Sequence, residues 1–168
     1  MLKPIQLYSL ISVGSQYIAV LEEINGPRLI PIWIGPAEGN AIALYVNGVT
    51  PPRPMTHDLF FSFFDVMEVK ILKVAITQLK ESTFYSSIFI RKKDKTIAVD
   101  ARPSDAISLA LRAKAPLFVE EDVFDQCEPL FKPISAEEVE EFKQTLGNLK
   151  PHDIYKDLKK GSKGQEQQ

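Results

Sequence analysis

Cysteine is nearly absent from this chain, since Cys127 is the single one among 168 residues. One cysteine excludes an internal disulfide framework and suits a reducing compartment. Long apolar runs are also missing, because no stretch approaches the ~18 residues of a membrane-spanning helix. No charged segment followed by an apolar one opens the chain as a leader would. The sequence therefore predicts a soluble, cytoplasmic protein.

The chain also lacks an excess of positive charge. Its 20 Lys and Arg are outnumbered by 22 Asp and Glu, which gives a net charge of −2. Tight binding to duplex nucleic acid usually relies on a basic surface, so this balance counts against a general duplex binder, although a nuclease that uses a metal can be acidic overall. Three catalytic signatures are missing as well: His-Glu-x-x-His, a glycine-rich phosphate loop and Gly-x-Ser-x-Gly.

What is present is 45% apolar residues, enough for one sizeable core. The most informative stretch is Asp100-Ala101-Arg102-Pro103-Ser104-Asp105-Ala106, which follows a strand-like run and precedes a helix-like one. Pro103 suits the first position of a helix, where its missing N–H costs nothing. Ser104 and Asp105 then lie in the first turn, near the positive end of the helix dipole. Taken alone, this corner is typical of a capped helix with an Arg–Asp pair.

The same corner occurs twice. Residues 30–44 align with residues 97–111 at a constant offset of 67, which places Pro36 on Pro103 and Glu38 on Asp105. Two diverged copies of a strand-strand-strand-helix unit, at about 5–46 and 72–113, are the simplest account. The predicted fold class is α+β, with a mixed or antiparallel sheet packed against helices.

The predicted domain covers residues 1–130, followed by a helical extension over 131–160 and a disordered tail over 161–168. In the extension, Ser135-Ala136-Glu137-Glu138 is a capping box that opens a helix from Val139 to Leu146. A last short helix is expected over 151–160. This part of the chain carries no motif with recognisable chemistry.

Several single positions carry further expectations. Pro31 inside a strand indicates an edge position or a bulge, and Trp33 is expected to anchor a core or an interface. Gly39 in a first helical turn indicates close approach of a backbone or a ligand, or a frayed turn. Thr56 is expected to cap a helix over 59–67. The large apolar residues of that helix have helical spacing and predict a core or a subunit contact, hence a homo-oligomer (dimer or higher).

Three blocks together resemble the signature blocks of the bifunctional nuclease (BFN) family. They are Leu29-Ile30-Pro31-Ile32-Trp33-Ile34-Gly35 with Glu38-Gly39, then Arg53-Pro54-Met55-Thr56-His57-Asp58-Leu59, then Asp100 to Ile107, in the family's order and spacing. The resemblance covers about residues 5–125, with Met55 where leucine is common. It implies a small bacterial or plastid-type protein of a family in which some members are credited with DNase and RNase activity.

Every candidate site residue lies at a strand end or a helix start, where loops of such folds usually carry function. The predicted catalytic residues are His57, Asp58, Asp105 and Glu38; the predicted substrate-binding residues are Arg53, Arg102 and Ser104; the predicted metal ligands are Glu38, Asp100 and Asp105. Carboxylates suit Mg²⁺ or Mn²⁺, arginines clamp phosphate oxygens, and a histidine transfers protons. If the two units pack together, the Glu38 and Asp105 corners face one another.

These residues support a low-specificity nuclease that hydrolyses phosphodiester bonds of RNA or DNA with a divalent metal. An alternative is a noncatalytic oligomeric module that binds a phosphorylated ligand or a protein partner, since helix N-termini attract anions. A third interpretation makes the same groups an ion-pair network that only locks the fold.

Overall fold

The computed structural model describes residues 1–128, 130–133, 136–148 and 150. Eight strands in these ranges form one mixed sheet, in the order β6-β5-β4-β7-β1-β2-β3-β8. The predicted α+β fold class is confirmed, including the duplicated strand-strand-strand-helix unit and the helical C-terminal region. No helix among the described residues is long and apolar enough to cross a membrane.

The duplicated unit accounts for most of the sheet. In each copy three strands pair antiparallel in sequence order and a helix follows. Each element of the second copy begins 67 residues after its counterpart in the first. The first copy is β1 (Leu2–Val13), β2 (Gln16–Glu23), β3 (Arg28–Ile34) and α1 (Pro36–Val46), and the second is β4 (Val69–Lys80), β5 (Thr83–Lys92), β6 (Lys95–Ala101) and α3 (Pro103–Ala113).

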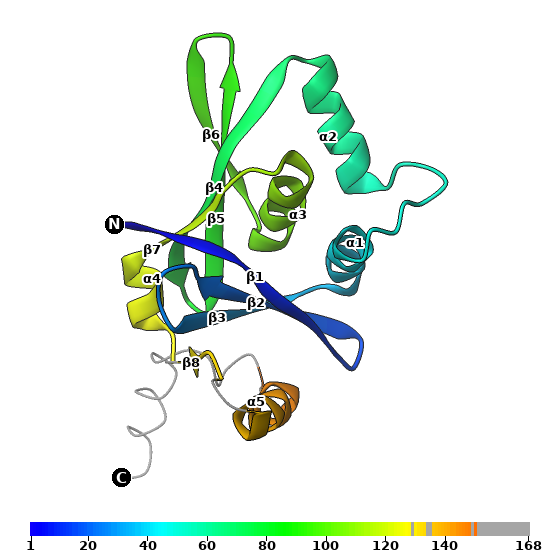
Figure 1. Cartoon of the computed structure of the whole chain (residues 1–168). Helices are drawn as coiled ribbons and strands as arrows, with labels where there is room; N and C mark the ends of the chain where they lie inside the picture. The colour runs from blue at the N-terminus through cyan, green and yellow to red at the C-terminus, as the bar shows by residue number, and fades with distance from the viewer. Residues whose placement is uncertain (129, 134–135, 149, 151–168) are drawn as a thin grey trace, which may run out of the picture.

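A short strand, β7 (Leu117–Glu120), joins the two copies into one sheet. It pairs parallel to β4 and antiparallel to β1. The remaining elements are α2 (Thr56–Val66), which lies between the copies in sequence, and α4 (Glu121–Gln126), β8 (Leu130–Phe131) and α5 (Ala136–Asn148) after them. The α3 helix lies between the second copy's strands and the α1 and α2 helices, whereas α5 lies below β1–β3 (Figure 1).

The main core lies between the sheet and the α1, α2 and α3 helices. One face of α3 is buried through Ala106, Ile107, Leu109 and Ala110, and it packs against alternate residues of the strands such as Ile76. The apolar stripe recurs at helical spacing on α3 and every second residue on the strands, which is why these elements form and pack in this way.

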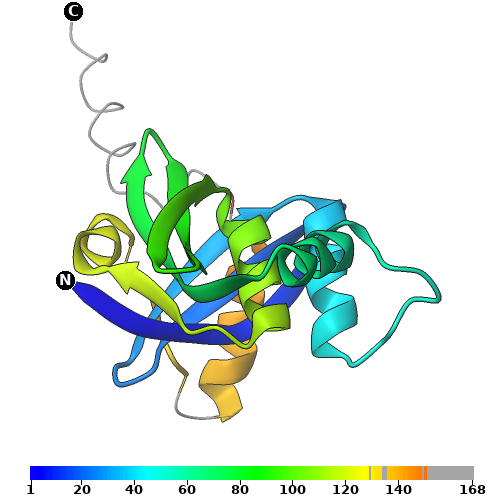
Figure 2. The same cartoon turned by 90° about the horizontal axis from the view of Figure 1, so that it is seen from above.

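A second, smaller core covers the other face of the first copy. Ile18 and Val20 of β2 are fully buried there together with Leu146 of α5, whereas Ala19 and Leu21 point into the main core. Both faces of β2 are thus covered. Figure 2 shows α5, in orange, against the strands of the first copy. The C-terminal helix belongs to the same folded unit.

Three expectations about single positions are answered by the packing. Pro31 pairs with Val20 on one side only, since β8 reaches no further than Leu29, so it has the predicted edge position. Trp33 packs against both cores. The close approach at Gly39 is made by a side chain, not by the backbone or ligand that the sequence predicted: a Cβ there would meet the Tyr17 ring at 2.2 Å.

Two local predictions differ from the structure. The residue that caps α2 is Met55, not Thr56, because the Asp58 carboxylate accepts a hydrogen bond from the Met55 backbone N–H at 3.0 Å. The helix predicted over 139–146 extends in α5 from Ala136 to Asn148. The predictions for Ser135, for a helix over 151–160 and for the tail 161–168 lie outside the described residues.

Candidate functional site

Arg102, the residue before α3, joins the first helical turns of both copies. Its Nε donates to Asp105 Oδ2 at 2.8 Å and its Nη2 donates to Glu38 Oε1 at 2.7 Å. The Glu38 and Asp105 corners therefore face one another, as the internal repeat predicts. These hydrogen bonds raise the pKa of Arg102 above its ordinary value, so the guanidinium stays charged between two carboxylates.

His57, in the first turn of α2, completes the cluster. Its Nε2 lies 3.0 Å from Asp105 Oδ1 and its side chain is 11% exposed. Burial of the Asp105 carboxyl opposes its ionisation, but the hydrogen bonds from Arg102 and His57 outweigh that effect and hold the pKa of Asp105 below its ordinary value. Asp105 is thus an ionised carboxylate that holds one imidazole and one guanidinium in place.

This cluster lies between two cavities. The first, of about 330 Å³, has a polar wall and is completed by small residues of α1 and by the start of α2; its lining is Ala37, Glu38, Asn40, Ala41, Met55, Thr56, His57, Arg102 and Asp105. The second, of about 320 Å³, lies between α2 and the β5–β6 strands and is largely apolar, with Asp100, His57 and Asp105 at one end. The imidazole–carboxylate pair is therefore accessible to a ligand from two sides.

Four of the predicted residues meet in the first cavity, and the others do not. Arg53 is exposed and lines a separate cavity with Asp58. Ser104 is buried beside a further cavity, which Arg102 and Trp33 also line. Asp100 shares the apolar cavity with Asp105. Arg53 and Arg102 thus line different cavities, and their role in holding phosphate oxygens stays a prediction.

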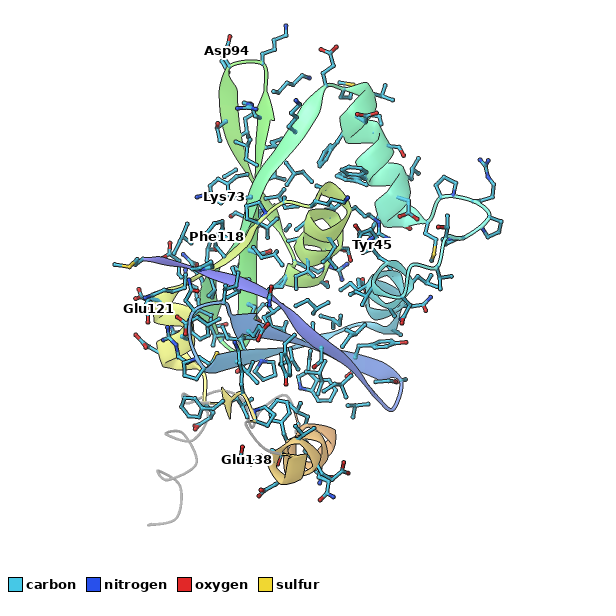
Figure 3. The ribbon with its side chains drawn as sticks, in the orientation of Figure 1. Tyr45, Lys73, Asp94, Phe118, Glu121 and Glu138 are labelled. Carbon is cyan, nitrogen blue, oxygen red and sulfur yellow. The ribbon has the colours of Figure 1, made fainter. Side chains whose placement is uncertain are left out.

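Arg112 is a site neighbour that the sequence analysis did not single out. Its side chain, only 7% exposed, donates through Nε to Asp58 Oδ1 and through Nη1 to the Ser108 carbonyl at 3.0 Å. Tyr45 of α1, labelled in Figure 3, lies with its ring 5.5 Å from the guanidinium carbon. In the sequence, Arg112 stands out as a charged residue at the end of the largely apolar run that begins at Ile107, and this is the signal by which it could have been found.

Asp58 is consequently part of a bridge between helices. It accepts hydrogen bonds from Arg112 and from the Met55 backbone N–H. Burial of the Asp58 carboxyl works against ionisation, yet the two hydrogen bonds prevail and lower its pKa. This bridge fixes the start of α2 on α3, and with it the position of the neighbouring His57.

The carboxylates of the cluster are a poor fit for a divalent metal in this arrangement. Both oxygens of Asp105 accept hydrogen bonds, and the Arg102 guanidinium occupies the position between Asp105 and Glu38. Within the described ranges, no three His, Cys, Asp or Glu side chains are grouped so as to hold an ion. A role of Mg²⁺ or Mn²⁺ therefore stays a prediction, and no chemical step is derived through a metal.

The fold and this cluster define an α+β domain with a polar site between duplicated corners. The sequence matches the bifunctional nuclease domain over residues 19–131. It is 40% identical over 149 residues to an uncharacterized protein of Mycobacterium tuberculosis, covering 83% of this chain and 89% of that protein. The chain belongs to the bifunctional nuclease domain family.

Relatives that carry the name nuclease are more distant. Bifunctional nuclease 1 of rice (Oryza sativa subsp. indica) is 27% identical over 105 residues, which is 61% of this chain and 32% of the rice protein. Bifunctional nuclease 2 of Arabidopsis thaliana is 25% identical over 108 residues, 62% of this chain and 32% of that protein. This chain spans about a third of those plant proteins.

Proposed function

We propose that this protein cleaves phosphodiester bonds of RNA or DNA with low sequence specificity, and that His57, held by Asp105, moves the proton. The observation that supports it best is the ordered series of contacts His57–Asp105–Arg102–Glu38 along the wall of one cavity. Membership of the bifunctional nuclease domain family and the named plant relatives support the substrate class.

The proton-transfer role of His57 follows from which of its ring nitrogens is hydrogen-bonded to Asp105. His57 Nε2 lies 3.0 Å from Asp105 Oδ1, and a carboxylate oxygen only accepts hydrogen bonds, so in the tautomer that we propose Nε2 carries the proton and Nδ1 has the lone pair. Nδ1 then takes a proton from the attacking hydroxyl or water as its oxygen bonds to phosphorus, and the charge of Asp105 stabilises the imidazolium that forms. The P–O bond to the leaving oxygen breaks, and the imidazolium returns the proton to that oxygen, either directly or through water. A general base of this kind contributes typically 10²–10⁴-fold to a rate.

Arg102 supplies the positive charge that a phosphodiester needs. Its Nε and Nη2 are engaged with carboxylates, and Nη1 is the nitrogen through which it donates to a phosphate oxygen. Glu38 and Asp105 fix the guanidinium plane, so the group need not reorganise as negative charge develops on the phosphorus oxygens. Glu38 thus acts as a positioning residue for Arg102.

The test is a nuclease assay on single-stranded RNA and on DNA, with Mg²⁺, Mn²⁺ or EDTA. We expect Asp105→Asn and His57→Gln to lower the rate at least about 10²-fold. Asp94→Asn, in the β5–β6 turn far from the site (Figure 3), is the matched control and keeps full activity. The EDTA arm reads the metal requirement directly.

Equal activity in wild type and both site variants would contradict the proposal and indicate a contaminant. No activity in any preparation, combined with thermal stabilisation by inorganic phosphate, would favour the noncatalytic module. Loss of folding in both site variants, seen by circular dichroism, would favour the ion-pair network. Glu38→Gln, which leaves the His57–Asp105 pair intact, then separates the catalytic role from the structural one: a folded variant with a lower rate supports catalysis, and an unfolded variant supports the network.

A further inference from the structure

The surface formed by α2 and β6 carries large apolar side chains that nothing in the described part of the chain covers. No residue of α2 is fully buried. Seven large apolar side chains on or next to these elements are 40–78% exposed: Leu59, Phe60, Phe63, Val66, Met67, Ile97 and Val99. A monomer rarely exposes a contiguous apolar patch of more than a few hundred Å², so this surface is suited to a partner.

The patch is continuous across the apolar cavity between α2 and the strands. Phe60 and Phe64 of α2 face Ile88 and Ile90 of β5 and Val99 of β6 across about 320 Å³. Figure 1 shows α2 and the β5–β6 hairpin rising on opposite sides of α3. Leu59, Phe63 and Val66 follow one another at helical spacing, which makes them a second apolar stripe on α2.

The β6 strand is also the open end of the sheet. It hydrogen-bonds to β5 on one side and is the terminal strand on the other. Its outer N–H and C=O groups form a template for another strand. Because the apolar patch includes side chains of this unpaired strand, we expect a partner with a strand that pairs with β6 and an apolar helix that covers the patch.

We propose that this partner is a second copy of the chain, with the two β6 strands paired antiparallel about a two-fold axis through Ala98. Ala98 is the midpoint of Lys95–Ala101, so this register pairs the whole strand. It places Ile97 of one copy opposite Val99 of the other, on the same face. Both α2 helices then lie on the same face of the joined sheet, and their apolar stripes border the surface that the two copies share.

The size of the surface agrees with this assembly. A stable interface takes about 800 Å² from each partner, and seven large side chains beside a seven-residue strand supply a substantial share of that area. Because the apolar cavity reaches His57 and Asp105, the second copy also closes one side of the candidate site to water. The assembly itself does not depend on the reaction catalysed there.

Sedimentation velocity of the full chain at micromolar concentration tests the assembly. We expect a dimer for wild type and a monomer for Phe63→Glu, whose side chain is 59% exposed and outside both site cavities. Ile24→Glu, exposed in a remote turn, is the matched control and stays dimeric. A monomeric wild type, or a Phe63→Glu protein that remains dimeric, would overturn the proposal.

Cross-linking tests the register. Cys127 is buried, so Ala98→Cys introduces one accessible thiol at the proposed axis, where facing Cα atoms of paired strands lie about 4.5–5.5 Å apart. We expect a disulfide-linked dimer on mild oxidation, and none for Ser15→Cys in the exposed β1–β2 turn. Dimers that form without cross-linking at position 98 would refute the β6 pairing.

Discussion

At the scale of single residues, arginines decide how the candidate site is built. Arg102 joins Glu38 to Asp105, and Arg112 fixes Asp58. In both cases a guanidinium at one end of α3 compensates a carboxylate from the first turn of another helix. The partners of Asp105 and Asp58 hold the pKa of each of these two carboxyls below its ordinary value, which makes both contacts sensitive to acid.

The effect of acid on stability can be tested at Asp58. Its pKa is lowered in the folded protein, so its contribution to stability is fully present above the unfolded pKa of about 3.9 and is lost as the pH falls through the lower folded value. We expect Asp58→Asn to be less stable than wild type by about 1–2 kcal/mol at pH 7. The difference should shrink at pH 3.

Urea unfolding of both proteins at pH 7, 5 and 3 measures this effect. Asp94→Asn, at an exposed turn, corrects for the general effect of removing one negative charge. A difference between wild type and Asp58→Asn that stays constant over this range would show that the Arg112 bridge does not stabilise the fold through its charge.

At the scale of elements, close packing between α1 and β2 brings the first corner to the site. Gly39 lies in the first turn of α1 and is buried against the ring of Tyr17. This contact lets the backbone of α1 approach the sheet, and it holds Glu38, the adjacent residue, where Arg102 reaches it. The glycine serves packing, although in an isolated helix it costs about 1 kcal/mol relative to alanine.

We therefore expect Gly39→Ala to destabilise the protein by about 1–3 kcal/mol, as overpacking of a core does, despite the better helix propensity of alanine. The control is Gly147→Ala in α5, where a new Cβ meets nothing within 4 Å; there stability should be unchanged or rise by up to about 1 kcal/mol. Thermal or urea unfolding measures both. Equal effects at the two glycines would contradict the packing role of Tyr17.

At the scale of the whole molecule, one sheet with cores on both faces connects the two copies of the repeat and the C-terminal region. β7 joins the copies, and α5 closes the second core through Leu146, which is fully buried beside Ile18 and Val20. The helix that follows the family-matched residues 19–131 is thus part of the fold that supports the site.

Leu146→Ala tests this dependence. Removal of a fully buried leucine side chain costs about 2–5 kcal/mol, and we expect a single cooperative unfolding transition at lower urea concentration. Ile24→Ala, at a side chain that is 47% exposed in the turn after β2 and outside the proposed dimer surface, is the control and should change the unfolding free energy little. Unchanged stability in Leu146→Ala would mean that α5 is not part of the cooperative unit.

The repeated unit and the local geometry of its corners follow from the amino-acid sequence alone. Pro103 and Asp105 lie in the first turn of α3 as expected, and Pro36 and Glu38 do the same in α1, because helix starts and strand periods depend on neighbouring residues. Three features depend on how the elements pack in three dimensions: Arg102 bridges the corners, Arg112 binds Asp58, and the apolar face of α2 stays exposed. These contacts join residues 54 or 64 positions apart, and local periodicity carries no information about which distant surfaces pack together.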